Sequence, residues 1–134
     1  PSTESTAVDM PYKQAAILHR AGVKFGFCYQ GDMEAMGQRN LPFSAGTSVA
    51  HGLPYEEAVA ALTLNTAQIL GIDEHTGQIK AGMDATFFIS KGDALDMMGN
   101  DVIHAFIKGQ KVDLDNKQKA LNRKYRNKYG LEVK

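Results

Sequence analysis

The chain has 134 residues, which favours a single compact domain with an apolar core of its own. Hydrophobic residues make up 43% and charged residues 22%, as in ordinary soluble globular proteins. The formal net charge is zero, so the composition gives no reason to expect a nucleic acid or an acidic membrane surface as a partner.

The cysteine count, the apolar runs and the N-terminal stretch bear on the compartment of the protein. Cys28 is the only cysteine, which excludes a disulfide within the chain and weakly favours a reducing compartment. Localisation therefore stays open between cytoplasm and periplasm. No apolar run approaches the roughly 18 residues of a membrane-spanning helix. The N-terminal stretch PSTESTAVDM has no signal-peptide pattern and no initiator methionine, and Pro1 favours an excised fragment over a processed chain.

The first part of the chain predicts a helix followed by a strand. Residues 1–10 are polar and are expected to form a loop or a disordered tail. Pro11 suits the first position of a helix, and small apolar residues continue until Gly22 closes it. The apolar run Val23–Tyr29 lies between two glycines and predicts a buried strand. A helix, a glycine and a buried strand form one step of an α/β architecture.

The next segment predicts a loop and then a second helix. Residues 31–40 contain a glycine and two methionines and are expected to form the loop. The helix opens at Leu41, has Ser44 as a possible cap, and runs to about His51. Gly52 then stops it.

Two shorter helices are predicted after this point. YEEAVAAL, residues 55–62, follows Pro54 and carries two glutamates in its first turn, where the helix dipole favours negative charge. TAQILGI can be capped by Asn65 and ends near Gly71.

The pattern changes to strands in residues 77–112. Ala85–Ser90 is rich in residues that favour strands. VIHAFIKGQKV contains two short runs around Lys108-Gly109, which is a plausible tight hairpin turn.

Residues 113–134 predict a C-terminal helix. The helix is expected from about Leu114 to Tyr129. Four apolar residues at spacings of seven and four form one stripe along it, namely Leu114, Leu121, Tyr125 and Tyr129. The basic run KQKALNRKYRNK is interpreted as a solvated helix face rather than a nucleic-acid contact, because the whole chain has no net charge.

The common catalytic and metal-binding patterns do not occur. No two histidines stand at His-x-His or His-x-x-x-His spacing, which a local metal clamp needs. All four are interpreted as surface or structural residues: His19, His51, His75 and His104. Cys28 lies in the predicted buried strand and is interpreted as a packing residue rather than a nucleophile. No phosphate-binding glycine loop and no Gly-x-Ser-x-Gly turn is present.

One loop has a positional argument for a site. In α/β proteins the loops after the C-terminal ends of strands carry the site, and Gln30, Asp32 and Glu34 follow the predicted strand. Ordinary polar loop residues are the simpler interpretation, and a site is the alternative. Asp32 is the candidate catalytic residue of this loop.

Several segments in order resemble a known family. They are VKFGFCYQGD, NLPFSAGTSVAHGLPYEEAVAALTLNTAQILGI, GQIKAGMDATFFIS and VIHAFIKGQKV. The most specific part is Thr63–Ile89, where T-x-N-x-A-x-x-L-G precedes G-x-I-x-x-G-x-D-A-x-x-x-I. Over residues 11–112 the chain resembles the C-terminal part of the amidohydrolase superfamily, in its imidazolonepropionase-like branch.

The resemblance implies an α/β fold that is a fragment of a larger one. In this family a distorted (β/α)8 barrel carries the active site, and a small β-sandwich is built from both chain ends. Val23–Gln30 would be the eighth barrel strand, residues 11–76 the C-terminal piece of the barrel domain, and residues 77–112 part of the sandwich. A helix over residues 113–134 would follow. A complete barrel takes ~250 residues, so most of it must be missing here.

The resemblance also implies a mechanism. One or two divalent metals, with zinc expected, activate a water that attacks the carbonyl of an amide, an ester or a ring C–N bond. For the parent of this chain the expected bond is an amide or cyclic amide. The family's ligands are a His-x-His after the first strand, a lysine or glutamate and two histidines from the middle strands, and an aspartate at the end of the eighth strand, which also acts as general base. This sequence lacks those histidine positions, so we expect no metal ligands in this chain alone.

The position of the family's aspartate reads Gln30 here. Glutamine cannot act as a base and is a weak ligand. Asp32 lies two residues on and would point to the same side if the strand continued, but Gly31 favours a turn at that point.

Two functions follow from these expectations. The first is a C-terminal fragment of a metal-dependent amidohydrolase, which hydrolyses a C–N bond in the full-length parent and is inactive by itself. The alternative, motivated by Gln30, is a fragment of a non-catalytic homologue that acts as a binding or structural module. The expected partners are the remainder of its own barrel and, through exposed strand edges, another copy of the chain. No nucleic-acid or membrane partner is expected.

Overall fold

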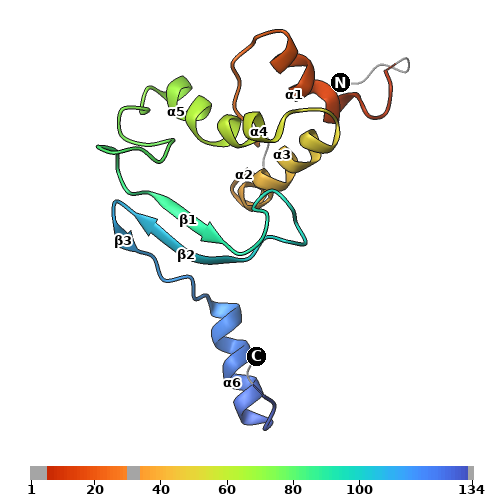
Figure 1. Ribbon diagram of the computed structural model, residues 1–134. Helices are drawn as coiled ribbons and strands as arrows, with labels where there is room; N and C mark the ends of the chain where they lie inside the picture. The colour runs from red at the N-terminus through yellow and green to blue at the C-terminus, as the bar shows by residue number, and fades with distance from the viewer. Residues whose placement is uncertain (1–5, 30–33, 133–134) are drawn as a thin grey trace.

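Helices in the first half of the chain and strands in the second half lie in two layers (Figure 1). The computed structural model describes residues 6–29 and 34–132. Short helices form the upper layer in this view, and a three-stranded antiparallel sheet lies below them. The predicted α/β class is confirmed at this level.

Helix α1 (Met10–Arg20) forms where it was predicted. Pro11 stands in its first turn, where the missing N–H has no helical partner to lose. Ala15 and Ala16 are buried against the other helices, and the chain turns at Gly22 immediately after the helix.

The buried strand predicted over Val23–Tyr29 is wrong for this structure. Residues 24–29 make no backbone hydrogen bonds to another described segment, and Cys28 is exposed. A strand needs a neighbour with which to exchange backbone hydrogen bonds, and none of the described strands lies beside this segment. Phe25 and Phe27 nevertheless pack against the helical core, with their rings edge-to-face at 5.8 Å.

The loop predicted over residues 31–40 is also wrong where the structure describes it. Two short helical turns occupy it, α2 (Glu34–Gly37) and η1 (Gln38–Asn40). Glutamate, alanine, methionine and glutamine favour helix, and their propensity outweighs that of the single glycine, Gly37, in this segment.

Helix α3 (Leu41–Ala50) confirms the second predicted helix but not its cap. Asn40 occupies the cap position, so Ser44 lies inside the helix. Ala45 is fully buried, and Gly46 lies so close to the loop after the first strand that a Cβ there would be 2.2 Å from the backbone oxygen of Leu95.

Helix α4 (Tyr55–Leu62) matches its prediction residue for residue, and α5 (Leu64–Leu70) begins earlier than predicted. Thr63, not Asn65, stands at the cap position of α5, and Asn65 lies within the helix. Gly71 closes α5 with φ 69°, a left-handed conformation that glycine adopts without strain.

The sheet contains β1 (Phe87–Ser90), β2 (Val102–Ile107) and β3 (Gln110–Lys111), paired in that order. The predicted turn between β2 and β3 is confirmed, because Lys108 and Gly109 both have positive φ, 49° and 78°, as a tight hairpin turn requires.

The core is built mainly from alanine. Six alanines are buried, together with two larger side chains, Leu53 at 2% exposure and Leu95 at 6%; the alanines are Ala15, Ala16, Ala45, Ala58, Ala61 and Ala67. Small side chains let the helix backbones approach closely, but they bury little apolar area per residue.

Helix α6 (Lys117–Lys128) extends from the sheet on the side opposite the helices (Figure 1). The Asn116 side chain caps it by accepting a hydrogen bond from the Lys119 backbone N–H at 2.9 Å. The helix begins three residues later than predicted, so Leu114 precedes it. The part of the predicted stripe that lies on α6 is open to solvent, since Leu121 is 40% and Tyr125 is 49% exposed. Within residues 6–29 and 34–132, no helix has the length and apolar character to cross a membrane.

Candidate functional site

The structure covers the candidate loop only in part. Gln30 and Asp32 lie outside the described residues. Glu34 begins α2, and only its backbone is described. The roles proposed for these three residues therefore stay predictions.

The residue before this loop is held by two helices. The Tyr29 hydroxyl lies 3.1 Å from the Ser44 hydroxyl in α3. A Cβ on Gly37 of α2 would come within 2.8 Å of the Tyr29 ring, so the ring fits against this helix only because the residue is glycine. The chain therefore enters the candidate loop from a fixed point.

A hollow of about 690 Å³ lies beside this segment, between α1 and α3. Phe25, Phe27 and Cys28 line one side of it, and Ser44 and Ser48 line the other. The interpretation of Cys28 as a buried packing residue is corrected here, because the thiol is exposed once the segment lies outside a sheet.

The four histidines lie apart on different elements. His19 Nδ1 lies 3.6 Å from a Glu57 carboxylate oxygen, and His51 Nδ1 lies 2.8 Å from the backbone oxygen of Thr47. His75 follows α5 in a turn, and His104 is exposed on β2. In the described part of the chain, no three histidine, cysteine, aspartate or glutamate side chains come together as a metal site would require.

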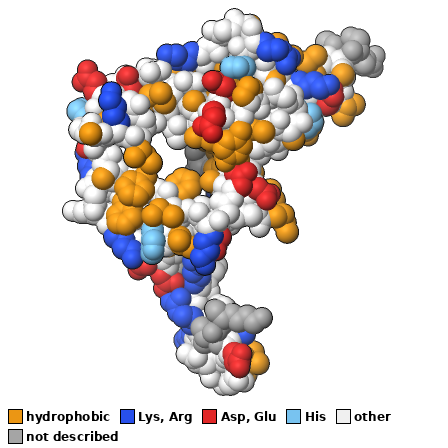
Figure 2. Space-filling view, in the orientation of Figure 1, with side chains coloured by type: hydrophobic (Ala, Val, Ile, Leu, Met, Phe, Trp, Pro, Cys, Tyr) orange, Lys and Arg blue, Asp and Glu red, His pale blue; other side chains and the backbone are white. Residues whose placement is uncertain are grey.

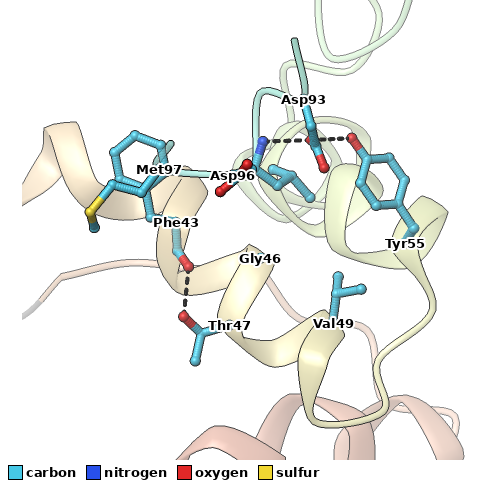
Figure 3. Close-up of a pocket in the computed structure, with 9 residues that line it drawn as sticks. Phe43, Gly46, Thr47, Val49, Tyr55, Asp93, Asp96 and Met97 are labelled. Carbon is cyan, nitrogen blue, oxygen red and sulfur yellow. Dashed lines mark hydrogen bonds between the residues drawn. The ribbon is translucent and has the colours of Figure 1, made fainter. Parts of the chain in front are cut away.

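A cleft of polar and aromatic side chains is formed by α3, the start of α4 and the loop after β1 (Figure 3). Its volume is about 330 Å³. Phe43, Tyr55 and Met97 supply apolar surface, and Asp93 and Asp96 supply two carboxylates. We call it the acidic cleft.

Asp93 is the best-bonded polar group of the acidic cleft. One of its carboxylate oxygens accepts hydrogen bonds from the Tyr55 hydroxyl at 2.7 Å and from the Leu95 backbone N–H at 2.8 Å (Figure 3). The Leu95 and Tyr55 bonds hold the pKa of Asp93 below its usual value, and the same carboxylate raises the pKa of Tyr55. Asp93 therefore stays ionised and Tyr55 stays protonated around neutral pH.

Further side-chain bonds shape the rest of this loop. Asp96 accepts from the Met98 backbone N–H at 3.1 Å, and the Asn100 side chain donates to the Ala94 backbone oxygen at 3.0 Å. The sequence patterns described above did not predict this loop as a site. Its signal was the run KGDALDMMGN, since Asp and Asn side chains that bond the backbone two residues on are typical of tight turns.

The acidic cleft presents chemistry suited to binding a cation. Ionised carboxylates beside aromatic rings attract ammonium and guanidinium groups.

Comparison with known proteins identifies a family. The sequence model of the amidohydrolase family matches residues 9–112. Among curated proteins, the amidohydrolase tasK of Hapsidospora irregularis is 33% identical over 67 residues, which cover 50% of this chain and 7% of that protein.

Solved structures that resemble this chain include amidohydrolases as well. An amidohydrolase from Thermotoga maritima MSB8 shares 26% identity with a TM-score of 0.65, over 83% of this chain and 29% of that one. A prolidase in complex with N-methylphosphonate-L-proline shares 26% identity with a TM-score of 0.57, over 76% of this chain and 26% of that one. Phenylurea hydrolase B, at 23% identity and a TM-score of 0.57, shows the shared fold over 81% of this chain. The chain thus spans between a quarter and a third of these three structures, 29%, 26% and 29% of their lengths.

Proposed function

The chain belongs to the amidohydrolase family and covers a fragment of the family fold, and from this we propose that it is the C-terminal segment of a metal-dependent hydrolase of C–N bonds. The observation that carries the proposal is the family match over residues 9–112 in a chain that spans 29% of a solved amidohydrolase. In the longer protein, residues 23–30 would form a barrel strand and residues 77–112 part of a β-sandwich.

The bond class has one source of support. A structural neighbour is a prolidase in complex with a phosphonate derivative of L-proline, whose phosphonate is attached at nitrogen. We therefore favour an amide or cyclic amide as the bond that the longer protein hydrolyses.

The metal would be held elsewhere in the longer protein. A bound divalent ion, zinc in our proposal, supplies an activated water for attack on the carbonyl carbon. The described residues do not fit such an ion, because they bring no three ligand side chains together. In our proposal this segment is inactive by itself and supports the site through the loop that Tyr29 anchors.

The first partner of this segment would be the remainder of its own barrel. A groove of about 660 Å³ runs between α4, α5 and β1, lined by apolar side chains that include Leu62, Phe87 and Phe88. Figure 2 shows hydrophobic side chains gathered around the hollow between the helices and the sheet. Ile79 also lines the groove and is 88% exposed, so the apolar wall of the groove is open to solvent. Exposed apolar patches of this kind mark surfaces that contact another part of a protein.

The test compares the 134-residue chain with the full-length protein that contains it. We expect hydrolysis of N-acyl amino acids only in the full-length protein, loss of that activity with a chelator, and its return with zinc. Metal analysis should find zinc in the full-length protein and none in the 134-residue chain. Stoichiometric zinc on the short chain would contradict the proposal.

A non-catalytic homologue is the second candidate, and Gln30 is the observation that favours it. In that case the full-length protein would bind no metal and hydrolyse nothing. The variants Gln30→Asp and Asp32→Asn in the full-length protein separate the two. If the protein is an enzyme that uses Asp32, Asp32→Asn should abolish turnover and Gln30→Asp should leave turnover measurable.

A further inference from the structure

Helix α6 holds itself in place through its own segment. Arg123 forms a two-pronged ion pair with Asp115, at 2.9 and 2.5 Å. Lys119 donates from its side chain to the Leu114 backbone oxygen, and Arg126 donates to that of Glu132. In the described residues, the polar contacts of this helix stay within the C-terminal segment. The helix therefore presents its faces to solvent, away from the helical layer (Figure 1).

The exposed faces of α6 have a definite chemistry. The helix contains six lysines and arginines and no acidic residue: Lys117, Lys119, Arg123, Lys124, Arg126 and Lys128. Leu121 and Tyr125 form an exposed stripe between the basic side chains. A narrow apolar seam with basic flanks is suited to a protein surface that is acidic and has apolar side chains of its own.

The charges of the chain are unevenly divided along its sequence. Residues 1–112 contain twelve acidic and eight basic side chains, a net charge of −4. Residues 113–134 contain three acidic and seven basic side chains, a net charge of +4. The zero net charge of the whole chain hides two oppositely charged parts.

The acidic cleft combines carboxylates with apolar side chains. Asp9, Asp84 and Asp101 already pair with lysines of the same chain. Among the described residues, no basic side chain forms an ion pair with Asp93 or Asp96. Phe43, Tyr55 and Met97 line the same cleft and can contact the stem of a lysine or arginine or the ring of a tyrosine (Figure 3).

We propose that α6 of one copy docks on the acidic cleft of a second copy, so that two reciprocal contacts hold a dimer. A second copy is favoured over the same copy because the capped, ion-paired start of α6 directs the helix away from the helical layer. It is favoured over an anionic membrane because the apolar stripe is narrow and polar at its tyrosines, whereas helices that lie in a membrane surface bury a broad apolar face. Reciprocal use of one pair of patches gives a closed twofold assembly.

The test uses the full-length protein, with its mass in solution measured by light scattering and its dissociation constant by sedimentation. Lys117→Glu/Lys124→Glu reverses two side chains that form no hydrogen bond or ion pair with the described residues, and we expect at least about a tenfold weaker dimer. Lys80→Glu/Lys111→Glu changes the net charge equally outside α6 and should leave the dimer unchanged. Circular dichroism should show the same helix content in both variants.

A second variant on the acceptor side completes the test. Asp96→Lys should also weaken the dimer, whereas Asp96→Asn, which keeps an oxygen for the Met98 backbone N–H, should weaken it less. Each reversed variant repels itself, but a mixture of Lys117→Glu/Lys124→Glu with Asp96→Lys pairs opposite charges at both contacts and should restore the dimer.

Three results would overturn the proposal. One is a monomeric wild type at about 100 µM in low salt, where exposed charges are little screened. Another is a dimer that survives Lys117→Glu/Lys124→Glu unchanged, which would point to pairing of strand edges. The third is a monomer that binds phosphatidylserine vesicles or duplex DNA through the same lysines. None of these results depends on hydrolytic activity, so the dimer and the proposed function are tested independently.

Discussion

Tyr55 in α4 donates its phenolic hydrogen to Asp93, which lies 38 residues later in the chain, at 2.7 Å. Leu95 follows two residues on and is buried in the helical core at 6% exposure. The bond and the buried leucine together attach the loop between β1 and β2 to the helical layer.

Removing the hydroxyl should loosen this attachment. Tyr55→Phe leaves Asp93 with the Leu95 N–H alone, and we expect the Tm to fall by about 2–4 °C, as for the loss of one partly exposed hydrogen bond. Thermal unfolding, monitored by circular dichroism, measures this change in Tm. Tyr12→Phe is the control, since Tyr12 is half exposed and contacts His51 through its ring. Equal losses in the two variants would contradict the expectation.

The same bond predicts a dependence on pH. The pKa of Asp93 is lowered from 3.8 by its hydrogen bonds, so its contribution to stability is present above that value and is lost as the pH falls through the lower folded pKa. The pKa of Tyr55 is raised from 10.0, so its contribution is present below that value and is lost as the pH rises through the folded pKa. The gap in free energy of unfolding between wild type and Tyr55→Phe should be constant from about pH 5 to 9 and shrink on both sides. If this difference in free energy of unfolding stayed constant down to the pH of acid-induced unfolding, the result would contradict the prediction.

Gly46→Ala tests the contact between α3 and the loop that joins β1 to β2. The sign of the change in free energy of unfolding decides the test. Alanine in a helix interior is favoured over glycine by about 1 kcal/mol, so propensity alone predicts stabilisation. The new Cβ would lie 2.2 Å from the Leu95 backbone oxygen, and we expect a net loss of about 1–3 kcal/mol instead. Urea unfolding measures the change. Thr47→Ala, one residue on, introduces the same side chain without that clash and should cost less.

Leu53 is the largest fully buried side chain among the described residues. Leu53→Ala should cost about 2–5 kcal/mol of unfolding free energy, because the surrounding alanines offer little material to fill the cavity. Leu70→Ala is the matched control, since Leu70 is 65% exposed, and it should change the free energy of unfolding by well under that amount. Similar costs at both positions would mean that the core is not where the structure places it.

Lys108 is the non-glycine residue with positive φ, at 49°, among those described. Asparagine tolerates this conformation better, and Lys108→Asn should stabilise the hairpin by about 0.5–1 kcal/mol. The ion pair lost with Asp84, at 3.7 Å between exposed groups, contributes little against this. Lys111→Asn in β3 should be neutral or slightly destabilising. A lower Tm for Lys108→Asn would show that the ion pair matters more than the turn.

Local signals were sufficient to predict several elements. α4 was predicted residue for residue because Pro54 stands at its start and two glutamates lie in its first turn. The turn at Lys108-Gly109 was predicted for the same reason, since the two residues themselves carry the required conformation.

Contacts between segments that lie far apart in the sequence could not be predicted from local patterns. The strand over Val23–Tyr29 was predicted from its apolar pattern, but a strand exists only through a neighbour, and no described strand lies beside it. The hydrogen bond from Tyr55 to Asp93 joins two residues that are 38 positions apart, and no sequence motif links them. The structure adds that the candidate loop begins at an anchored tyrosine, while the roles of Gln30 and Asp32 stay predictions.

The attachment of the loop at Leu95 has a consequence for the order of folding. Helices α1, α3, α4 and α5 contact one another, and β1 contacts β2, so each layer is built from neighbours along the chain and can form quickly. Insertion of Leu95 joins the layers and would come last. In the native protein, amide hydrogens of the loop should then exchange through a local opening that leaves both layers folded, at a lower free energy than those of α3 or α4.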